Sequence, residues 1–318
     1  MKVLVTGGAG FIGANLVRRL LLDGFEVTVL DDLSTGHKKN LEEVFDKITF
    51  LEQDVEEEFD GEFDIIFNLA CPASPKKYVI KPVKTMKTNF LGTLNVLELA
   101  LKTGAKVLHA STSEIYGDAL VHPQHEEYLG NVNTVGPRSC YDEGKRIAES
   151  LCFEYFLKGV DVRVVRIFNT YGPYMDSLDG RVVSNFILQA LNGEDITIYG
   201  NGSQTRSFQF VDDLVEVFML YVNESKDELL AKFKDNGWVN LPILNTGNPG
   251  EFTIKELAEK VISLTNSNSK LVYLELPQDD PKQRRPDITL AKNILGWQPK
   301  IQLDEGLKKT IKYFKELL

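Results

Sequence analysis

The stretch that decides the fold is VLVTGGAGFIG at residues 3–13, where an apolar run leads directly into closely spaced glycines. Glycine is required in such a loop because a Cβ would block both the tight turn and the approach of a pyrophosphate to backbone N–H groups. An apolar-periodic helix is predicted to follow over Phe11–Leu22, with Phe11 and Ile12 anchoring its start on a sheet. The stretch therefore predicts a strand, a dinucleotide-binding loop and a helix. The glycines satisfy two known patterns. Gly8, Gly10 and Gly13 match the general dinucleotide-binding fingerprint, and Gly7, Gly10 and Gly13 match its short-chain variant.

A pair of carboxylates follows the second predicted strand at the distance expected for a ribose-binding acid. The strand-like run 26–30 ends at Asp31 and Asp32, about 20 residues beyond the glycine loop. A carboxylate there repels a 2′-phosphate, so the pattern favours NAD over NADP. Lys38 and Lys39 follow closely and weaken this preference without removing it.

Two further positions are expected to meet the adenosine half of the cofactor. Asp54 follows the third strand and is predicted to contact the adenine amino group. Leu69 and Ala70 end the fourth strand and are predicted to lie under the adenosine ribose. These positions extend the predicted NAD site beyond the glycine loop.

Short apolar strands alternate with longer helical patterns up to about Ile167. This alternation predicts an α/β fold, a doubly wound parallel sheet of the Rossmann type. The predicted strands are Val3–Thr6, Glu26–Leu30, Thr49–Leu51, Asp64–Leu69, Lys106–Ala110 and Val162–Ile167, and the predicted helices are Phe11–Leu22, Pro82–Lys102 and Tyr141–Lys158.

The regular alternation ends after Asn169, and the remainder predicts a smaller, interleaved C-terminal α/β lobe for substrate over the carboxyl edge of the sheet. Residues 1–168 are expected to form the cofactor domain, with returns near 207–222 and 243–247, and residues 169–318 mainly the substrate-binding lobe. The predicted elements are helices Val183–Asn192 and Asp212–Val222, strands Thr197–Tyr199, Leu244–Gly247 and Leu271–Leu274, a helix capped by Thr253, a polar loop Gln278–Pro286 and two terminal helices.

Composition narrows the class of protein. A net charge of −10 over 318 residues argues against nucleic acid as a partner, since phosphate binding needs basic surface. The apolar runs are too short for a membrane span, and the start of the chain lacks a signal-peptide pattern, so a cytoplasmic protein is expected. Three cysteines without metal-type spacing fit a reducing compartment, and no metal site is expected.

A tyrosine and a lysine four residues apart form the predicted catalytic pair. Tyr141 and Lys145 share one face of a helix start. A lysine ammonium there is expected to lower the pKa of the tyrosine below about 10 and to let it take a hydroxyl proton. Thr112, at the end of the strand that begins at Lys106, is expected to hold the same oxygen, and Lys145 also to reach the nicotinamide ribose.

At this point the sequence resembles the extended short-chain dehydrogenase/reductase superfamily, and within it the family of UDP-glucuronate decarboxylases (UDP-xylose synthases). The resemblance covers most of the chain. It rests on Asn68–Pro75, Ser111–Glu114 with Tyr116–Asp118, His122–Gln124, Asn131–Lys145, Arg166–Pro173, Asp179–Phe186 and Gln204–Phe208. The related sugar 4,6-dehydratases carry an Asp where this chain has Ser113, which suits a reaction that expels no hydroxyl. A segment from Asn223 to Leu241, with an extra helix predicted over Asp227–Phe233, departs from the family pattern.

The resemblance implies NAD-dependent decarboxylation of a UDP-sugar by a homodimer that pairs the helices 82–102 and 141–158 across a two-fold axis. The implied catalytic set is Tyr141, Lys145, Thr112, Ser113, Glu114 and Arg284. The implied cofactor set is Gly7, Gly10, Phe11, Ile12, Gly13, Asp31, Asp32, Asp54, Val55, Leu69, Ala70, Thr88, Tyr141 and Lys145. The implied substrate set is Tyr78, Lys87, Glu114, Asn169, Arg181, Thr197, Tyr199, Arg206 and Arg284.

Two other functions stay open at the level of sequence. A UDP-glucuronate 4-epimerase also oxidises C4 but keeps the carboxylate, and Ser113, Glu114 and the Arg284 motif argue against it. A non-enzymatic NAD-binding regulator needs no Tyr–Lys pair, so the presence of Tyr141 and Lys145 argues against that reading.

Overall fold

A seven-stranded parallel sheet forms the centre of the molecule in the computed structural model, which describes residues 1–275 and 283–318. The strand order is β11-β6-β5-β4-β1-β2-β3, and every neighbouring pair is parallel. The doubly wound sheet predicted from the alternation is confirmed. Its strands are β1 Lys2–Thr6, β2 Glu26–Asp31, β3 Ile48–Glu52, β4 Ile65–Asn68, β5 Lys106–Thr112, β6 Val162–Ile167 and β11 Ile243–Thr246.

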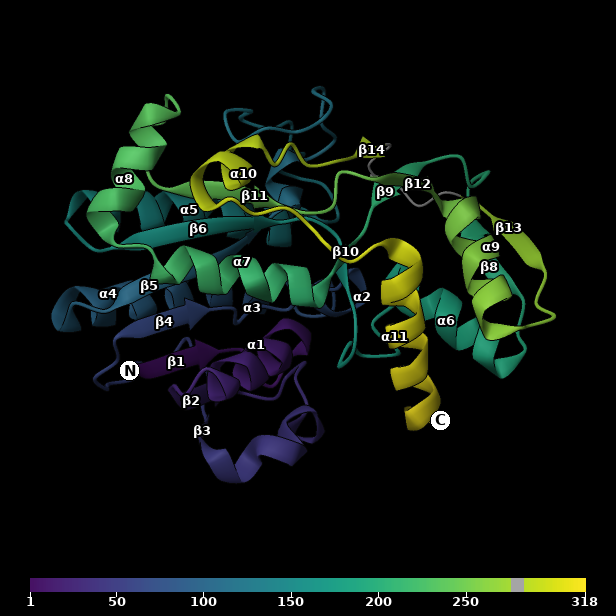
Figure 1. Ribbon diagram of the computed structural model, residues 1–318, viewed down its shortest axis with the longest axis horizontal. Coiled ribbons are helices and arrows are strands. Elements are labelled where there is room, and N and C mark those ends of the chain that lie inside the picture. The colour runs from purple at the N-terminus through teal and green to yellow at the C-terminus, as the bar shows by residue number, and fades with distance from the viewer. Residues whose placement is uncertain (276–282) are drawn as a thin grey trace.

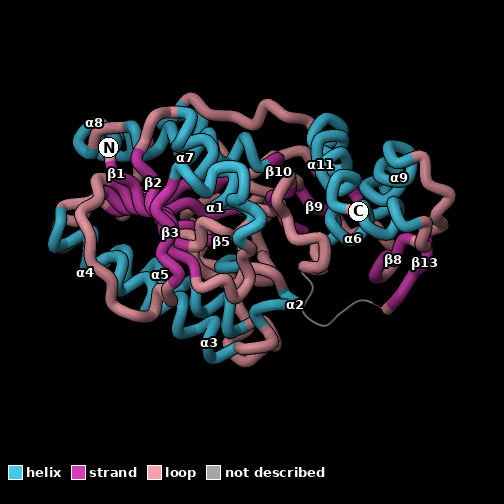
Figure 2. The backbone as a smooth tube through the Cα atoms, turned by 90° about the horizontal axis from the view of Figure 1, so that it is seen from below, coloured by secondary structure: helices cyan, strands magenta, loops and turns pink. Residues whose placement is uncertain are grey.

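Helices cover both faces of this sheet, as Figure 2 shows with α1 and α7 on one side and α3, α4 and α5 on the other. The apolar strand residues are therefore buried on both sides, which is why the strands read as continuous β-branched runs. The covering helices are α1 Phe11–Leu22, α3 Pro82–Lys87, α4 Thr93–Thr103, α5 Ser139–Leu157 and α7 Val211–Asn223.

Several C-terminal elements gather at one end of the molecule, on the right of Figure 1. There α6 (Val182–Asn192), α9 (Ile254–Thr265) and α11 (Leu303–Leu317) pack together beside the parallel pair β8 (Ile196–Tyr199) and β13 (Leu271–Leu274). The cap predicted for α9 is confirmed, because the Thr253 Oγ1 accepts the Glu256 N–H at 3.1 Å. The Glu256 carboxylate in turn accepts the Thr253 N–H at 2.7 Å and completes a capping box.

Short elements that the periodicity did not predict connect the two parts. They are the 3-10 helices η1 Lys38–Lys47 and η3 Ser113–Tyr116, the helix α2 Pro75–Tyr78, and the strands β7 Thr170–Tyr171, β9 Thr205–Ser207, β10 Gln209–Phe210, β12 Glu251–Thr253 and β14 Gln283–Arg284. Strand β9 pairs with both β12 and β14. The loop predicted over Gln278–Pro286 thus contains β14, and its first part lies outside the described residues.

The prediction of one continuous helix over Pro82–Lys102 is wrong. This stretch is divided into α3, a π-helical turn η2 (Thr88–Gly92) and α4. The predicted extra helix near Asp227 is confirmed as α8 (Lys226–Asp235), where Leu229 and Phe233 are buried beside α10 (Thr289–Leu295). The additional segment is thus packed onto the body of the protein.

None of the helices in the described part of the chain combines the length and the apolar character needed to cross a bilayer. Among the residues with described positions, no group of three or more His, Cys, Asp or Glu side chains could hold a metal ion.

Candidate active site

A cavity of about 650 Å³ lies along the carboxyl ends of the strands and extends toward the C-terminal elements. Open parallel sheets bind ligands at this edge, next to the point where the strand order reverses. Here the order reverses between β1 and β4, because β2 and β3 follow β1 in one direction and β5, β6 and β11 follow β4 in the other. The predicted cofactor residues that line the cavity are Gly7, Gly10, Phe11, Ile12, Gly13, Asp31, Asp32, Asp54, Val55, Leu69, Ala70, Thr88, Tyr141 and Lys145.

The glycine loop leaves room that side chains would fill. Gly7 has φ +70°, and a Cβ on it would lie 2.9 Å from the backbone of Ala70. A Cβ on Gly13 would lie 2.3 Å from the carbonyl oxygen of Gly7. Both positions therefore demand glycine, and the loop presents bare backbone at the start of α1. This cradle fits the diphosphate of a dinucleotide, which binds N–H groups at a helix N-terminus.

The two carboxylates after β2 differ in their surroundings. Asp31 is buried, and its oxygens accept the N–H groups of Ala9 at 2.9 Å and Leu33 at 2.9 Å. Burial raises the pKa of Asp31 against these two hydrogen bonds. Asp32 is exposed and accepts the Ser34 N–H at 3.0 Å. Asp31 thus fixes the shape of the glycine loop as well as facing the cavity.

Asp54, predicted to contact the adenosine half of the cofactor, takes part in an ion pair that the sequence did not indicate. The Asp54 carboxylate pairs with the Lys84 ammonium, which also lies 2.6 Å from Glu56. The Thr88 hydroxyl donates to Glu56 at 2.8 Å. Partial burial raises the pKa of Asp54, but the hydrogen bond from Lys84, the hydrogen bond from the Glu56 N–H and the charge of Lys84 together outweigh it and lower the pKa overall. The Asp54 carboxylate, which is predicted to meet the adenine amino group, is thus already paired with Lys84.

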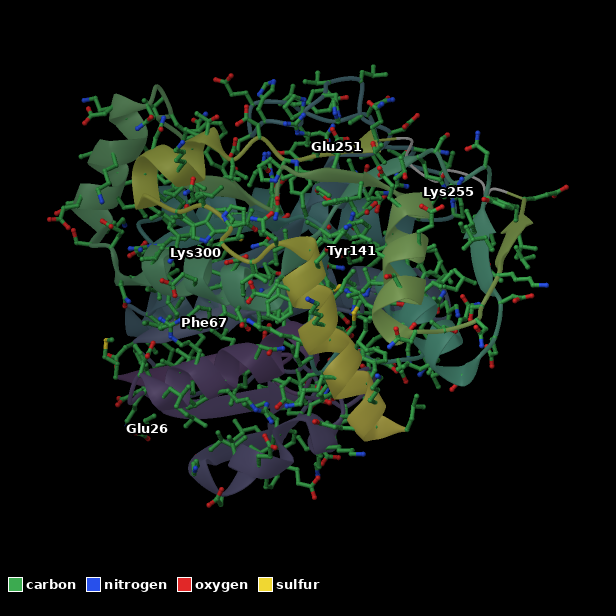
Figure 3. All side chains as sticks on the ribbon, turned by 45° about the vertical axis from the view of Figure 1, so that its right-hand side comes forward. Glu26, Phe67, Tyr141, Glu251, Lys255 and Lys300 are labelled. Carbon is green, nitrogen blue, oxygen red and sulfur yellow. The ribbon has the colours of Figure 1, made fainter. Side chains whose placement is uncertain are left out.

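Tyr141 is buried at the first turn of α5, near the centre of the molecule in Figure 3. Its ring stacks on that of Tyr78, with centroids 4.8 Å apart and an angle of 4° between the planes. The Lys145 ammonium donates to the Ala110 carbonyl at 2.8 Å. Tyr141 and Lys145 both line the cavity, so the structure brings the predicted pair together.

The prediction that Lys145 lowers the pKa of Tyr141 is wrong. Burial raises that pKa well above its usual value, and the hydrogen bond to Thr112 only partly offsets the effect. Lys145 acts elsewhere, because its charge lowers the pKa of the buried His109 imidazole beyond the effect of burial. A buried phenol needs a positive charge close by before it ionises at neutral pH.

Glu114 is surrounded by guanidinium groups. It lies 3.1 Å from Arg284 and 2.5 Å from Arg138. Burial raises the pKa of Glu114, but the charges of Arg284, Arg138 and Arg206 outweigh it and hold the pKa below its usual range. Glu114 is therefore a carboxylate at neutral pH.

Arg284 reaches this place from the opposite end of the chain. Its guanidinium is only 2% exposed and donates to the Ser113 hydroxyl at 3.0 Å and to the Gly117 carbonyl at 3.1 Å. Ser113, Glu114 and Arg284 thus form one hydrogen-bonded group on the wall of the cavity next to Tyr141.

Sequence reasoning missed two charged residues beside this group. Arg138 binds Glu114, and Asp142 is a buried carboxyl whose pKa burial and the charge of Glu114 raise to about 7. Arg138 stands three residues before Tyr141, and Asp142 directly follows it. Their place in the stretch 131–145 that carried the family resemblance was the available signal.

All but one of the expected substrate residues line the cavity. They are Tyr78, Glu114, Asn169, Arg181, Thr197, Tyr199, Arg206 and Arg284. Lys87 is exposed on α3 and is not among the lining residues that the structure describes, whereas Lys84, one turn earlier, is. Arg181 is held by Asp179 at 2.5 Å and lies over the Phe11 ring at 5.5 Å.

The parallel sheet, the glycine cradle and the buried Tyr–Lys pair define a class, the dinucleotide-dependent enzymes of the short-chain type. Comparison with known proteins makes this specific. Residues 3–230 match the model of the NAD dependent epimerase/dehydratase family. The chain belongs to that family.

Three relatives are informative. A UDP-glucuronic acid decarboxylase 1 of Danio rerio is 52% identical over 320 residues, covering 100% of this chain and 73% of that protein. The structure of a UDP-glucose 4-epimerase from Thermotoga maritima with UDP-glucose is 31% identical, with a TM-score of 0.87 and coverage of 100% and 99%. A UDP-glucuronic acid 4-epimerase from Bacillus cereus, in complex with UDP-glucuronic acid and NAD, is 25% identical, with a TM-score of 0.86 and full coverage of both chains.

Proposed function

We propose that this chain is an NAD-dependent UDP-glucuronate decarboxylase that makes UDP-xylose. The observation that carries this proposal is the group of Ser113, Glu114 and Arg284 on the cavity wall beside Tyr141. Identity of about half to curated UDP-glucuronic acid decarboxylases, along the whole chain, supports it.

The reaction follows from the chemistry of the substrate. Bound NAD would supply a hydride acceptor at C4 of the sugar and, once reduced, a hydride donor at the same carbon, so there would be no net redox change. A ketone at C4 stands β to the carboxylate on C5, and carbon dioxide leaves because the ketone accepts the electron pair as an enolate. Protonation at C5 and reduction of the ketone then give the pentose.

Tyr141 is the proposed acid and base at the C4 oxygen. It takes the hydroxyl proton during oxidation and returns it during reduction. Thr112, which hydrogen bonds to Tyr141, holds the same oxygen. Lys145, which lines the same cavity, is proposed to hold the nicotinamide ribose.

Glu114 and Arg284 are proposed to act around decarboxylation and C5 protonation. Arg284 offers a buried positive charge that would attract the substrate carboxylate and the enolate. Ser113 provides a hydroxyl where a dehydratase carries an acid, so the site lacks a group there to expel a sugar hydroxyl. The carboxylate of Glu114 keeps Arg284 and Arg138 in place and can direct a proton toward C5.

The remaining lining residues are proposed to hold the UDP part. Asn169, Arg181 and Arg206 would bind the diphosphate, Thr197 and Tyr199 the uridine, and Tyr78 the sugar. Residues 1–168, with the returns near 207–222 and 243–247, are the proposed cofactor domain, and 169–318 mainly the substrate-binding lobe. Cys71, Cys140 and Cys152 are free thiols, which supports the inference of a reducing, cytoplasmic compartment.

Mass spectrometry of the products from UDP-glucuronate and NAD tests the function. A decarboxylase yields UDP-xylose, lighter by the mass of carbon dioxide. Recovery of UDP-galacturonate at unchanged mass would instead identify the 4-epimerase, and failure to turn over the sugar nucleotide would favour an NAD-binding regulator.

We further propose a homodimer built on α3, α4 and α5. Large apolar side chains are exposed on these neighbouring elements and the π-helical turn between them, which lie on one side of the sheet in Figure 2. They are Val83 at 66%, Met86 at 48%, Phe90 at 37%, Leu101 at 43%, Ile147 at 45%, Phe153 at 36% and Leu157 at 63% exposed. Such a face on a water-exposed helix layer is typical of a subunit interface.

A further inference from the structure

Arg284 reaches the active site on a strand too short to hold it. Strand β14 has two residues and pairs with β9 through Gln283–Thr205 and Arg284–Arg206. A pair of this length has little stability of its own. Yet the Arg284 guanidinium is buried and bonds to Ser113, Glu114 and Gly117. Another contact must fix this segment of the chain.

Gln124 makes that contact. Its backbone N–H donates to the Arg285 carbonyl at 2.9 Å, and its side-chain Oε1 accepts the Arg285 N–H at 2.9 Å. Its carbonyl accepts the Asp287 N–H at 2.7 Å. Three hydrogen bonds from one residue thus hold the backbone directly after Arg284, and Gln124 is 0% exposed, so water cannot replace them.

Gln124 is in turn fixed to the central sheet. Its Nε2 donates to the Val121 carbonyl at 2.7 Å, and its carbonyl accepts a second bond from Asn245 Nδ2 at 3.0 Å. Asn245 belongs to β11, is fully buried, and accepts the Tyr116 hydroxyl at 2.8 Å. Tyr116 ends the 3-10 helix that contains Ser113 and Glu114. The same network therefore reaches both sides of the contact between Arg284 and Glu114.

The ion pairs around this segment are more exposed. Glu251, labelled in Figure 3, lies 3.2 Å from His122 and 3.5 Å from Arg285, whose side chains are 30% and 40% exposed. Exposed ion pairs contribute little to position, because water and salt screen them. The buried hydrogen bonds of Gln124 are the stronger constraint.

We propose that Gln124 is a positioning residue for Arg284 and thereby controls the steps after C4 oxidation. This inference rests on the proposed decarboxylase function. Gln124 does not line the cavity among the described residues, so it acts through Arg284 and not on the sugar. Loss of its side-chain bonds lets the guanidinium move from Ser113 and Glu114, while the glycine cradle, Tyr141 and Lys145 remain in place.

Gln124→Met tests this proposal, because it keeps the approximate size of the side chain and removes the two side-chain hydrogen bonds, to the Val121 carbonyl and from the Arg285 N–H. In this variant the rate of C4 oxidation of UDP-glucuronate, measured by the absorbance of the reduced cofactor, should stay near the wild-type rate. Release of carbon dioxide should fall roughly tenfold, the effect of about one buried hydrogen bond. Arg284→Ala should change the same ratio in the same direction.

Thr310→Val provides the matched control. Thr310 is also 0% exposed and donates to the Gly306 carbonyl of its own helix α11 at 2.8 Å, and α11 lies apart from β14 in Figure 1. It should lower stability without changing the ratio of carbon dioxide release to C4 oxidation. An unchanged ratio in Gln124→Met, while Arg284→Ala lowers it, overturns the proposal. Wild-type protein that makes no UDP-xylose would instead refute the proposed function.

A measurement on the wild-type protein covers the case in which Gln124→Met does not fold. The amide protons of Arg285 and Asp287 should exchange slowly with solvent, since both are bonded to Gln124. Exchange at the rate of a free loop would show that Gln124 does not hold the segment and would also overturn the proposal.

Discussion

Tyr141 and its surroundings carry the chemistry at the scale of single residues. Tyr141→Phe removes only the titrating hydroxyl, and the stacking of the ring on Tyr78 can persist. We expect the fold and NAD binding to survive while turnover of UDP-glucuronate falls by about 10²–10⁴-fold. Steady-state kinetics and a cofactor titration measure both effects. Wild-type turnover in this variant would remove Tyr141 from the mechanism.

Glu114→Gln and Arg284→Ala should behave differently, because their proposed roles come partly after oxidation. Either variant should still reduce bound NAD with UDP-glucuronate while making little UDP-xylose. Absorbance of the reduced cofactor and release of carbon dioxide, measured together, separate the two stages. Normal decarboxylation by both variants would leave the overall reaction intact but contradict these two assignments.

The segment between η3 and α5 illustrates the scale of secondary-structure elements. Glu126 in this segment is buried, and its Oε1 accepts the Asn245 N–H of β11 at 2.8 Å. Burial raises the pKa of Glu126 to about 7, against the lowering effect of that hydrogen bond. The segment is therefore attached to the sheet through a carboxyl group that prefers to be neutral.

This raised pKa makes the stability of the protein depend on pH. Because the folded state binds the Glu126 proton more tightly than the unfolded state, the free energy of unfolding falls as the pH rises from about 4.5 to about 7. The amide of Glu126→Gln does not titrate, so this variant lacks the part of the fall in the free energy of unfolding that is due to Glu126. Its stability relative to wild type should rise across that range by up to about 3 kcal/mol. Chemical denaturation at pH 5 and pH 8 measures the difference.

Glu127→Gln is the control for this experiment, since Glu127 is the exposed neighbour in the chain. It should follow the wild-type dependence on pH. Parallel curves for Glu126→Gln and wild type would contradict the buried, neutral state of Glu126.

The exposed apolar face on α3, α4 and α5 matters at the scale of the whole molecule. Phe153→Glu places a charge on this face, where Phe153 is 36% exposed. We expect light scattering to report a dimer for wild type at micromolar concentration and a monomer for the variant, because burying an unpaired carboxylate opposes association. Leu22→Glu, at an 84% exposed position on α1 on the opposite side of the sheet, should remain dimeric. A monomeric wild type would refute the proposed interface.

The sequence determined the sheet and the cofactor cradle, because both depend on local patterns. Gly7 and Gly13 are required by backbone contacts within one strand-loop-helix unit, and the apolar runs of β1, β4 and β5 need only two buried faces. The residues of the Tyr141 pair were predictable for the same reason, since an i, i+4 spacing places both on one helix face. The position of α8 was predictable from its own apolar residues.

Tertiary structure decided which charges meet. The sequence could not show that Lys84 pairs with Asp54, that Lys145 donates to Ala110, or that burial raises the pKa of Tyr141. Each of these depends on how far water is excluded, and that depends on the packing of distant segments. The contact between Arg284 and Glu114 joins residues 170 positions apart through a two-residue strand. Periodicity predicts no such contact, because only the closed fold brings the two segments to one place.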